Sequence, residues 1–359
     1  IKLIHFYLKN GIKVFRLDAI AFLWKEKNTS CLNLLQTHEI VKLIRTLLNA
    51  YSKDTLLITE TNLPNLENLS YFGNSDEANS IYNFALPPLL LWTFLMGDST
   101  AIRKWSMGMP PAKDHTTYFN FIASHDGIGI RPTEGILTDN ERSTLVNIIK
   151  DFGGEISYRR KSDNSESVYE LNIALIDAMK GTFKGIDHMQ TERFIAAHAI
   201  MLSLEGIPAF YVHSVIGTSN DYELVKKTKN KRSINRKSWN YEDIDKLLSD
   251  SKSQNFVIYN NLKKLIEIRK KQSAFHPNAT QFTFNLGPNF FGIWRQSLDK
   301  KQSIFSVTNV SNVFQYLDLS ELNLIESNEW WDLISNEIII DIKAIISLKA
   351  YQTVWITNY

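Results

Sequence analysis

The sequence has little cysteine and little charge imbalance, and both shortages exclude classes of protein. Cys31 is the only cysteine among 359 residues, so no intrachain disulfide can form and no trace of an oxidising compartment is present. The formal net charge is only +2 at pH 7, which is too small over this length to predict a nucleic-acid or anionic membrane partner. We therefore expect a cytoplasmic location.

Long hydrophobic runs are also lacking. The apolar run 86–96 is broken by Pro87 and Pro88 and is too short to span a bilayer. The first residues do not show the basic, apolar and small-residue order of a signal peptide, so we expect a soluble protein. Residue 1 is Ile, not Met, and residues 1–10 resemble the end of a helix. We therefore expect an N-terminal truncation.

Hydrophobic residues make up 44% of the chain and charged residues 22%, which is typical of a globular protein with a large core. Over roughly two hundred residues, short apolar runs alternate with longer helical patterns, which predicts an α/β fold around a parallel sheet. The predicted strands are 13–18, 55–60, 79–84, 118–124 and 207–212. The predicted helices are 36–50, 88–96, 192–204 and 255–271.

The last part of the chain has a different pattern. Alternating apolar runs separated by turn residues predict a small all-β domain. These runs are 282–284, 290–294, 303–307 and 352–356. We therefore predict two domains, 1–277 and 278–359, of which the second is β-sandwich-like.

Three predicted strands of the first domain end in acidic residues. Asp18 follows Val14–Leu17, Glu60 follows residues 56–59, and Asp126 follows the run 121–125. Active sites of parallel barrels lie at the carboxyl ends of the strands, so these acids are the first candidates for catalysis.

Glycoside chemistry needs two such carboxylates in different surroundings, one ionised and one protonated. Arg16 lies two residues before Asp18 and so projects to the same side of the strand, which favours an ionised Asp18. Glu60 has no adjacent cation in the sequence and suits the protonated role. Asp126, with His125 beside it, could hold sugar hydroxyls and stabilise an oxocarbenium-like transition state.

Each acid alone has a simpler interpretation as a helix N-cap or an ion-pair member. The segment 226–237 contains seven Lys and Arg residues, and we interpret it as a solvated loop, with attraction of an anionic substrate as the alternative. A metal-dependent hydrolase would present several histidines at strand ends, whereas here His125 is the only histidine on such an end next to an acid.

The motifs Phe15-Arg16-Leu17-Asp18-Ala19, Thr59-Glu60 and Ser124-His125-Asp126 resemble, in order and spacing, the second to fourth signature regions of the α-amylase superfamily, glycoside hydrolase family 13. The resemblance implies a (β/α)₈ barrel followed by a small all-β domain. It also implies that Asp18 is the nucleophile, Glu60 the acid/base and Asp126 the transition-state stabiliser, with Arg16 and His125 around the reacting sugar.

Further motifs resemble the sucrose phosphorylase subfamily, and within it the glucosylglycerate phosphorylase branch. They are 83–91, 125–129, 206–208 and 233–236 for the subfamily, and 60–64, 130–135 and 168–172 for the branch. The resemblance implies reversible transfer of a glucosyl group to phosphate, giving α-glucose 1-phosphate. It places Tyr169 at the end of a mobile loop, 153–168, and Arg236 at the sugar.

The remaining predictions accompany this resemblance. We predict Arg131 as a ligand of phosphate or glycerate, with a surface ion-pair partner as the alternative. No cofactor and no metal are implied, and the expected partners are a small sugar and phosphate. The superfamily's first signature region is not found in the sequence, so we expect that only strands four to eight of the barrel are present and that this polypeptide alone is inactive. Hydrolysis or transglycosylation, and a catalytically inactive scaffold, remain alternatives.

Overall fold

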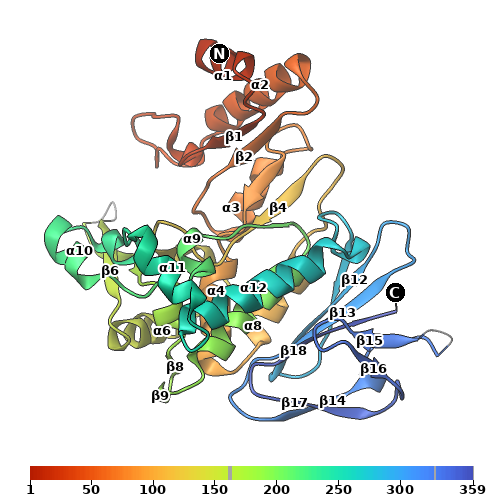
Figure 1. The fold of residues 1–359 in the computed structure, drawn as a ribbon. Coiled ribbons are helices and arrows are strands. Elements are labelled where there is room, and N and C mark those ends of the chain that lie inside the picture. Colours follow the sequence, from red (N-terminus) through yellow and green to blue (C-terminus); the bar gives the residue numbers. More distant parts are fainter. Residues whose placement is uncertain (161–163, 327–328, 359) are drawn as a thin grey trace.

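The structure is a computed structural model that describes residues 1–160, 164–326 and 329–358. Its N-terminal half is built on a five-stranded parallel sheet with the order β1-β2-β3-β4-β10, seen at the upper end of the molecule in Figure 1. The strands are β1 (Val14–Leu17), β2 (Leu56–Thr59), β3 (Ser80–Tyr82), β4 (Thr117–Asn120) and β10 (Ile207–Pro208). Strands that follow each other in the sequence are neighbours in the sheet, as in a βα barrel.

Two strands end earlier in the structure than the sequence predicts. The strand predicted over 118–124 ends at Asn120, so Ser124, His125 and Asp126 lie in the following loop. Residues 121–123 are buried by packing and not by strand pairing, which gives the same apolar signal. The strand predicted over 207–212 ends at Pro208, whose ring removes a hydrogen-bond donor.

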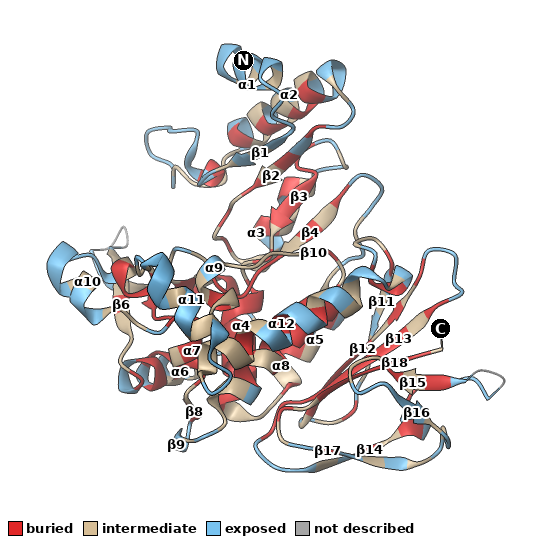
Figure 2. Cartoon of the chain, in the orientation of Figure 1, coloured by how far each residue is buried: buried red, intermediate tan, exposed pale blue. Residues whose placement is uncertain are grey.

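Helices cover the parallel sheet and fill the centre of the molecule, and they include the four predicted ones. Their bounds are α1 (Lys2–Lys9), α2 (Leu35–Tyr51), α3 (Asn65–Leu69), α4 (Leu86–Met96), α5 (Thr100–Gly108), α6 (Asp139–Asp151), α7 (Leu175–Ala178), α8 (Gln190–Ser203), α9 (Val212–Val215), α10 (Tyr222–Thr228), α11 (Tyr241–Ser249) and α12 (Gln254–Lys270). Figure 2 shows buried residues on the middle strands of the sheet and throughout α4, whereas β1, α1 and α10 have no buried residue.

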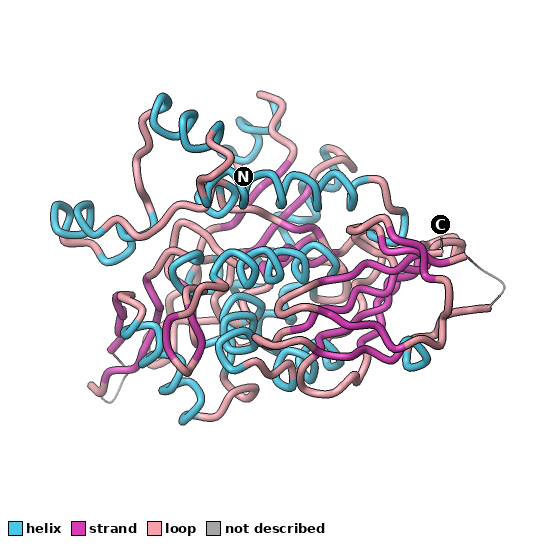
Figure 3. The backbone as a smooth tube through the Cα atoms, turned by 60° about the horizontal axis from the view of Figure 1, so that its bottom comes forward, coloured by secondary structure: helices cyan, strands magenta, loops and turns pink. Residues whose placement is uncertain are grey.

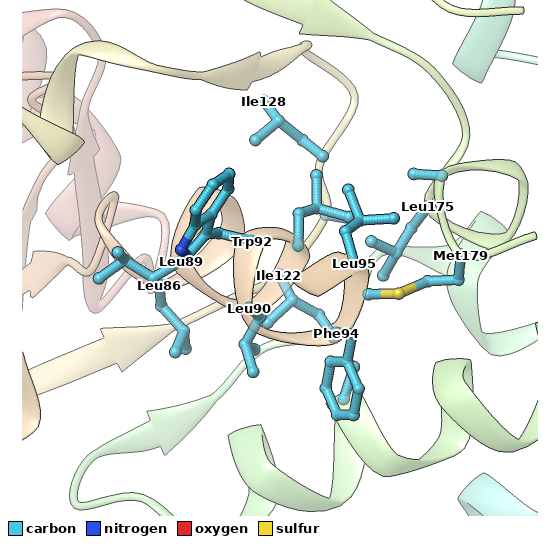
Figure 4. Packing of buried hydrophobic residues seen from close by; sticks show 14 of the residues in the cluster. Leu86, Leu89, Leu90, Trp92, Phe94, Leu95, Ile122, Ile128, Leu175 and Met179 are labelled. Carbon is cyan, nitrogen blue, oxygen red and sulfur yellow. The ribbon is translucent and has the colours of Figure 1, made fainter. Parts of the chain in front are cut away.

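Helix α4 is buried on all sides and forms the centre of the main core. Pro87 and Pro88 lie in its first turn, where the missing backbone donors cost nothing, so the helix begins at Leu86. Figure 4 shows its side chains pointing in several directions, toward Ile122, Ile128, Leu175 and Met179. Ile122 and Ile128, which follow β4, belong to the same buried cluster, so α4 supports this segment.

Between β4 and β10 a small antiparallel sheet with the order β5-β7-β6 is inserted. Its strands are β5 (Ile128–Gly129), β6 (Glu155–Arg160) and β7 (Glu166–Asn172), and a further hairpin consists of β8 (Gly181–Thr182) and β9 (Gly185–Ile186). The mobile loop predicted over 153–168 includes residues 161–163, which lie outside the described residues. Its described part belongs largely to β6 and β7, and Tyr169 is a strand residue.

The C-terminal part is all antiparallel β structure, as predicted. A six-stranded sheet has the order β11-β12-β13-β18-β15-β16, and β14 pairs with β17. The bounds are β11 (Thr280–Thr283), β12 (Phe290–Gln296), β13 (Ser303–Asn309), β14 (Gln315–Asp318), β15 (Trp330–Asp332), β16 (Glu337–Ile339), β17 (Ile345–Leu348) and β18 (Thr353–Thr357). The predicted boundary after residue 277 lies just before β11 and stays a prediction.

The C-terminal strands, grouped at one side of the molecule in Figure 3, pack against the helices. Leu202 of α8, Leu265 of α12, Ile304 of β13 and Trp355 of β18 belong to one buried cluster. The apolar contact thus joins the two parts of the chain over a continuous core. In the described part of the chain no helix is long and apolar enough to cross a membrane.

Candidate active site

Asp18 and Glu60 come together because of the register between β1 and β2. Leu17 lies opposite Thr59, and the Glu60 amide donates to the Leu17 carbonyl at 3.1 Å, so the acids that follow are neighbours at the same sheet edge. Arg16 lies between them: Nη1 is 2.6 Å from Oδ1 of Asp18, and Nη2 is 3.9 Å from Oε2 of Glu60. The predicted pairing of Arg16 with Asp18 is therefore present.

The two carboxyl groups differ in their surroundings. The side chain of Asp18 is 76% exposed, whereas that of Glu60 is 14% exposed. Burial raises the pKa of Glu60, and Asp18 and Asp126 raise it further, while the Ala19 amide at 2.7 Å and the Arg16 charge lower it. No cation is adjacent to Glu60 in the sequence, but strand pairing brings Arg16 close to it in space. Burial nevertheless outweighs that charge, which suits a carboxyl that must carry a proton.

Asp126 reaches the same site from the loop after β4. Arg232 donates through Nη1 to its Oδ1 at 2.7 Å, and Arg236 donates through Nη2 to the same oxygen at 3.1 Å. Arg236 also donates through Nε to the His125 carbonyl at 2.7 Å, and Asn235 donates to the Ser124 carbonyl. These contacts hold a loop that has no strand pairing of its own.

A cavity of about 140 Å³ is enclosed by the three acids and their neighbours. Its lining comprises Asp18, Ala19, Ala21, Phe22, Glu60, Thr61, Asn62, Leu63, Phe84, Asp126, Gly127, Tyr169, Glu170 and Arg232. The predicted Tyr169 is thus part of the cavity wall, and burial raises the pKa of its hydroxyl. Arg16 lies beside the cavity and donates through Nε to the Tyr82 hydroxyl at 3.1 Å.

The other predicted site residues do not line the cavity. His125 Nε2 is 3.7 Å from Asp126 Oδ1, and neither His125 nor Arg236 lines the cavity. Arg131 does not line it either, although the neighbouring Ile130 amide donates to the Tyr169 carbonyl at 3.3 Å. The Nε atom of Arg131 is buried and has no acceptor among the described residues.

Sequence reasoning missed two residues of the site, Glu170 and Arg232. The basic composition of 226–237 predicts a solvated loop, and this prediction is wrong for Arg232. Arg232 lies in the 3₁₀ helix Lys231–Asn235 and pairs with Glu170 of β7, 62 residues earlier in the chain. No local pattern in the sequence separates Arg232 from the other basic residues of this segment.

Metal binding has no support in the described ranges, where no group of three or more His, Cys, Asp or Glu side chains could hold an ion. What the cavity offers is two carboxyl groups in different environments, a third carboxylate held by two guanidinium groups, and an arginine shared by the first two. This arrangement can perform acid and nucleophile chemistry at one carbon atom.

Comparison with known proteins agrees with this geometry, although no family model matches the chain. It is 35% identical to the glucosylglycerate phosphorylase of Escherichia coli over 98% of this chain and 61% of that protein. It is 36% identical to the glucosylglycerate phosphorylase of Spirochaeta thermophila over 99% of this chain and 61% of that protein. These relatives support membership of the sucrose phosphorylase-like group of glycoside hydrolase family 13.

Solved structures of this family share the fold. The sucrose 6F-phosphate phosphorylase from Thermoanaerobacter thermosaccharolyticum superposes with a TM-score of 0.74 at 20% identity, over 97% of this chain and 63% of that one. The trehalose-6-phosphate hydrolase from Bacillus licheniformis gives 0.63 at 15% identity, over 99% and 67%. The predicted fold class, barrel strands followed by a small all-β part, is confirmed. The chain spans about 61% of the length of the curated relatives it matches.

Proposed function

We propose that the chain carries the catalytic carboxylates of a retaining phosphorylase, which transfers a glucosyl group from an α-glucoside to phosphate and gives α-glucose 1-phosphate. The observation that carries the proposal is the placement of Asp18 and Glu60 on adjacent strand ends, beside Arg16 and in one cavity with Asp126. The identity of 35% and more to glucosylglycerate phosphorylases supports a donor of the glucosylglycerate type over a sucrose-type donor.

In the first step Asp18 attacks the anomeric carbon, and the bond to the aglycone oxygen breaks. Glu60 gives its proton to that oxygen, so the aglycone leaves as an alcohol and a β-glucosyl ester forms on Asp18. Positive charge develops on the sugar ring in the transition state, and the Asp126 carboxylate stabilises it. The raised pKa of Glu60 keeps a proton available for this step.

In the second step an oxygen of phosphate attacks the same carbon from the opposite side, and the Asp18 carboxylate leaves. The proton of the attacking phosphate hydroxyl passes to Glu60, which restores the starting state. We propose Arg236 as a contact to the sugar and Arg131, with its unpartnered Nε, as a ligand of phosphate or of a substrate carboxylate. Side chains and the two substrates account for every step, so we propose no cofactor.

Hydrolysis by the same carboxylates is the second candidate, because water can replace phosphate as the acceptor of the glucosyl group. The two functions share their first step and differ only in the acceptor, which makes them separable by experiment.

The test uses the full-length gene product that contains this sequence, incubated with α-glucose 1-phosphate and a panel of acceptors: D-glycerate, fructose, fructose 6-phosphate, glycerol and water. The readout is phosphate release. Fast release with one acceptor and slow release with water alone is the expected result. Release that does not depend on any acceptor contradicts phosphorolysis and supports hydrolysis.

Substitution of the nucleophile gives the sharper prediction. We expect Asp18→Asn to lower turnover by about four orders of magnitude or more, because the amide cannot form the ester. Asp54→Asn is the matched control: Asp54 precedes the same strand pair at its opposite end and is 75% exposed. Substantial turnover by Asp18→Asn contradicts the assignment, as does an equal loss in the control.

A further inference from the structure

Glu170 lies in the cavity but has no part in the mechanism above. Its side chain is only 4% exposed, and burial raises its pKa. A buried carboxylate is costly unless it is paired, and Arg232 pairs it in a bidentate manner. Nε donates to Oε2 at 2.9 Å, and Nη2 donates to Oε1 at 2.6 Å. Both oxygens of Glu170 thus accept from one edge of the Arg232 guanidinium group.

The remaining side of that guanidinium group points at Asp126. Nη1 of Arg232 donates to Oδ1 of Asp126 at 2.7 Å, and Arg236 approaches the same oxygen at 3.1 Å. No hydrogen bond reaches Oδ2 of Asp126 from the part of the chain that the structure describes. One oxygen of Asp126 is therefore fixed by two cations, which determines where the other oxygen points.

The backbone around Glu170 is equally constrained. Glu170 of β7 lies opposite Gly129 of β5, directly after the Asp126 loop. A Cβ atom on Gly127 would lie 2.8 Å from Cβ of Glu170, so only glycine allows this approach of the two segments. The position of Glu170 is thus constrained by its backbone. Glu170 in turn pairs with Arg232, and Arg232 pairs with Asp126.

We propose that Glu170 is a positioning residue for Asp126: its bidentate ion pair holds Arg232 so that Arg232 directs the Asp126 carboxylate toward the reacting sugar. The inference rests on the proposed function. All three nitrogens of Arg232 donate to these two carboxylates, so we do not propose Arg232 as the phosphate ligand. Loss of the Glu170 charge leaves Arg232 paired with Asp126 alone. The bidentate ion pair that orients the plane of its guanidinium group is then lost.

The test is steady-state kinetics of the full-length gene product with Glu170→Gln, which keeps the shape of the side chain and removes its charge. We expect kcat to fall by about 10- to 100-fold, because Asp126 acts in the transition state and a misplaced carboxylate stabilises it poorly. KM for α-glucose 1-phosphate should change little. A loss of folding would lower the amount of active enzyme, so Tm and active-site concentration are measured alongside. Arg232→Lys, which keeps the charge but cannot bridge two carboxylates, should show the same split between kcat and KM.

A double variant tests whether Glu170 acts through Arg232 or whether the two residues contribute to kcat independently. If Glu170 acts through Arg232, Glu170→Gln combined with Arg232→Gln should be no slower than Arg232→Gln alone. The control is Glu223→Gln, which removes an exposed partner of Lys226 at 2.8 Å and should leave kcat unchanged. Wild-type kcat in Glu170→Gln, or a double variant whose loss is the product of the single losses, overturns the inference. A wild-type enzyme without phosphate transfer contradicts the proposed function instead.

Discussion

At the scale of single residues, one arginine lies near two acids for which we propose opposite roles. Arg16 is 2.6 Å from Asp18 and 3.9 Å from Glu60, yet only Glu60 is largely removed from water. Burial disfavours the charged form of a carboxyl group, so the pKa of Glu60 is raised despite the nearby charge of Arg16. The surroundings of Glu60, and not the residue type alone, thus suit it to the protonated role that we propose.

The raised pKa of Glu60 predicts a cost in stability. The folded chain binds this proton more tightly than the unfolded chain, so the free energy of unfolding falls as the pH rises through the ordinary value of 4.5 and on through the folded-state pKa. Glu60→Gln has no charge at any pH. We therefore expect it to raise Tm by about 1–3 °C near pH 7.5 and by less near pH 4.

Calorimetry of both proteins at the two pH values measures this difference. Glu39→Gln is the control, because Glu39 is an exposed acid paired only with Lys42. Its Tm difference from the wild type should not show the same dependence on pH. An equal effect of Glu60→Gln at both pH values would mean that burial of its charge is not the cause.

At the scale of helices and strands, the sequence predicted most of what carries the site. The strands before Asp18 and Glu60 were predictable because short apolar runs that close on an acid are typical of parallel strands. The strand before Asp126 was not predicted correctly, because Phe121 and Ile122 are buried without strand pairing. Apolar runs report burial, and they do not report which backbone groups are hydrogen-bonded.

The pair of Glu170 and Arg232 could not be predicted at all. Its two members are 62 residues apart, and neither stands in a local pattern that names the other. A basic segment on the surface and a basic segment that turns inward have the same composition. The contact depends on how β7 and the 3₁₀ helix Lys231–Asn235 are placed by the inserted antiparallel sheet.

Helix α4 provides the stability prediction at this scale. Phe94 is fully buried among the residues drawn in Figure 4, so Phe94→Ala removes a ring from a packed core. We expect the free energy of unfolding to fall by about 3–5 kcal/mol, from the lost burial and the remaining cavity. Denaturant unfolding measures it, with Met107→Ala of α5 as the control because Met107 is 63% exposed. A loss below about 1 kcal/mol would show that this core repacks around the cavity.

At the scale of the whole molecule, two buried arginines tie the helices to the C-terminal sheet. Arg193 of α8 donates to the Tyr351 hydroxyl at 3.1 Å and lies over its ring. Arg295 of β12 donates to the carbonyls of Ser203 and His276, each at 2.8 Å. These contacts, together with the shared apolar cluster, join the C-terminal part to α8 and α12.

The parallel sheet, by contrast, has two open edges. Among the described residues, β1 pairs only with β2 and β10 pairs only with β4. Leu3, Phe6 and Val14 near the β1 edge are 66%, 59% and 51% exposed. An unpaired edge beside apolar side chains is a template for association with another chain. We therefore expect the polypeptide of residues 1–359, prepared on its own, to self-associate.

Light scattering during size-exclusion chromatography tests this expectation over a range of concentrations. Val14→Lys places a charge on the open edge and should shift the polypeptide toward the monomer, because a lysine there opposes strand addition. Ile340→Lys is the matched control: Ile340 is 95% exposed and lies far along the chain, in the C-terminal part. If Ile340→Lys restores the monomer and Val14→Lys does not, association occurs through the C-terminal sheet and the open barrel edge is not the cause.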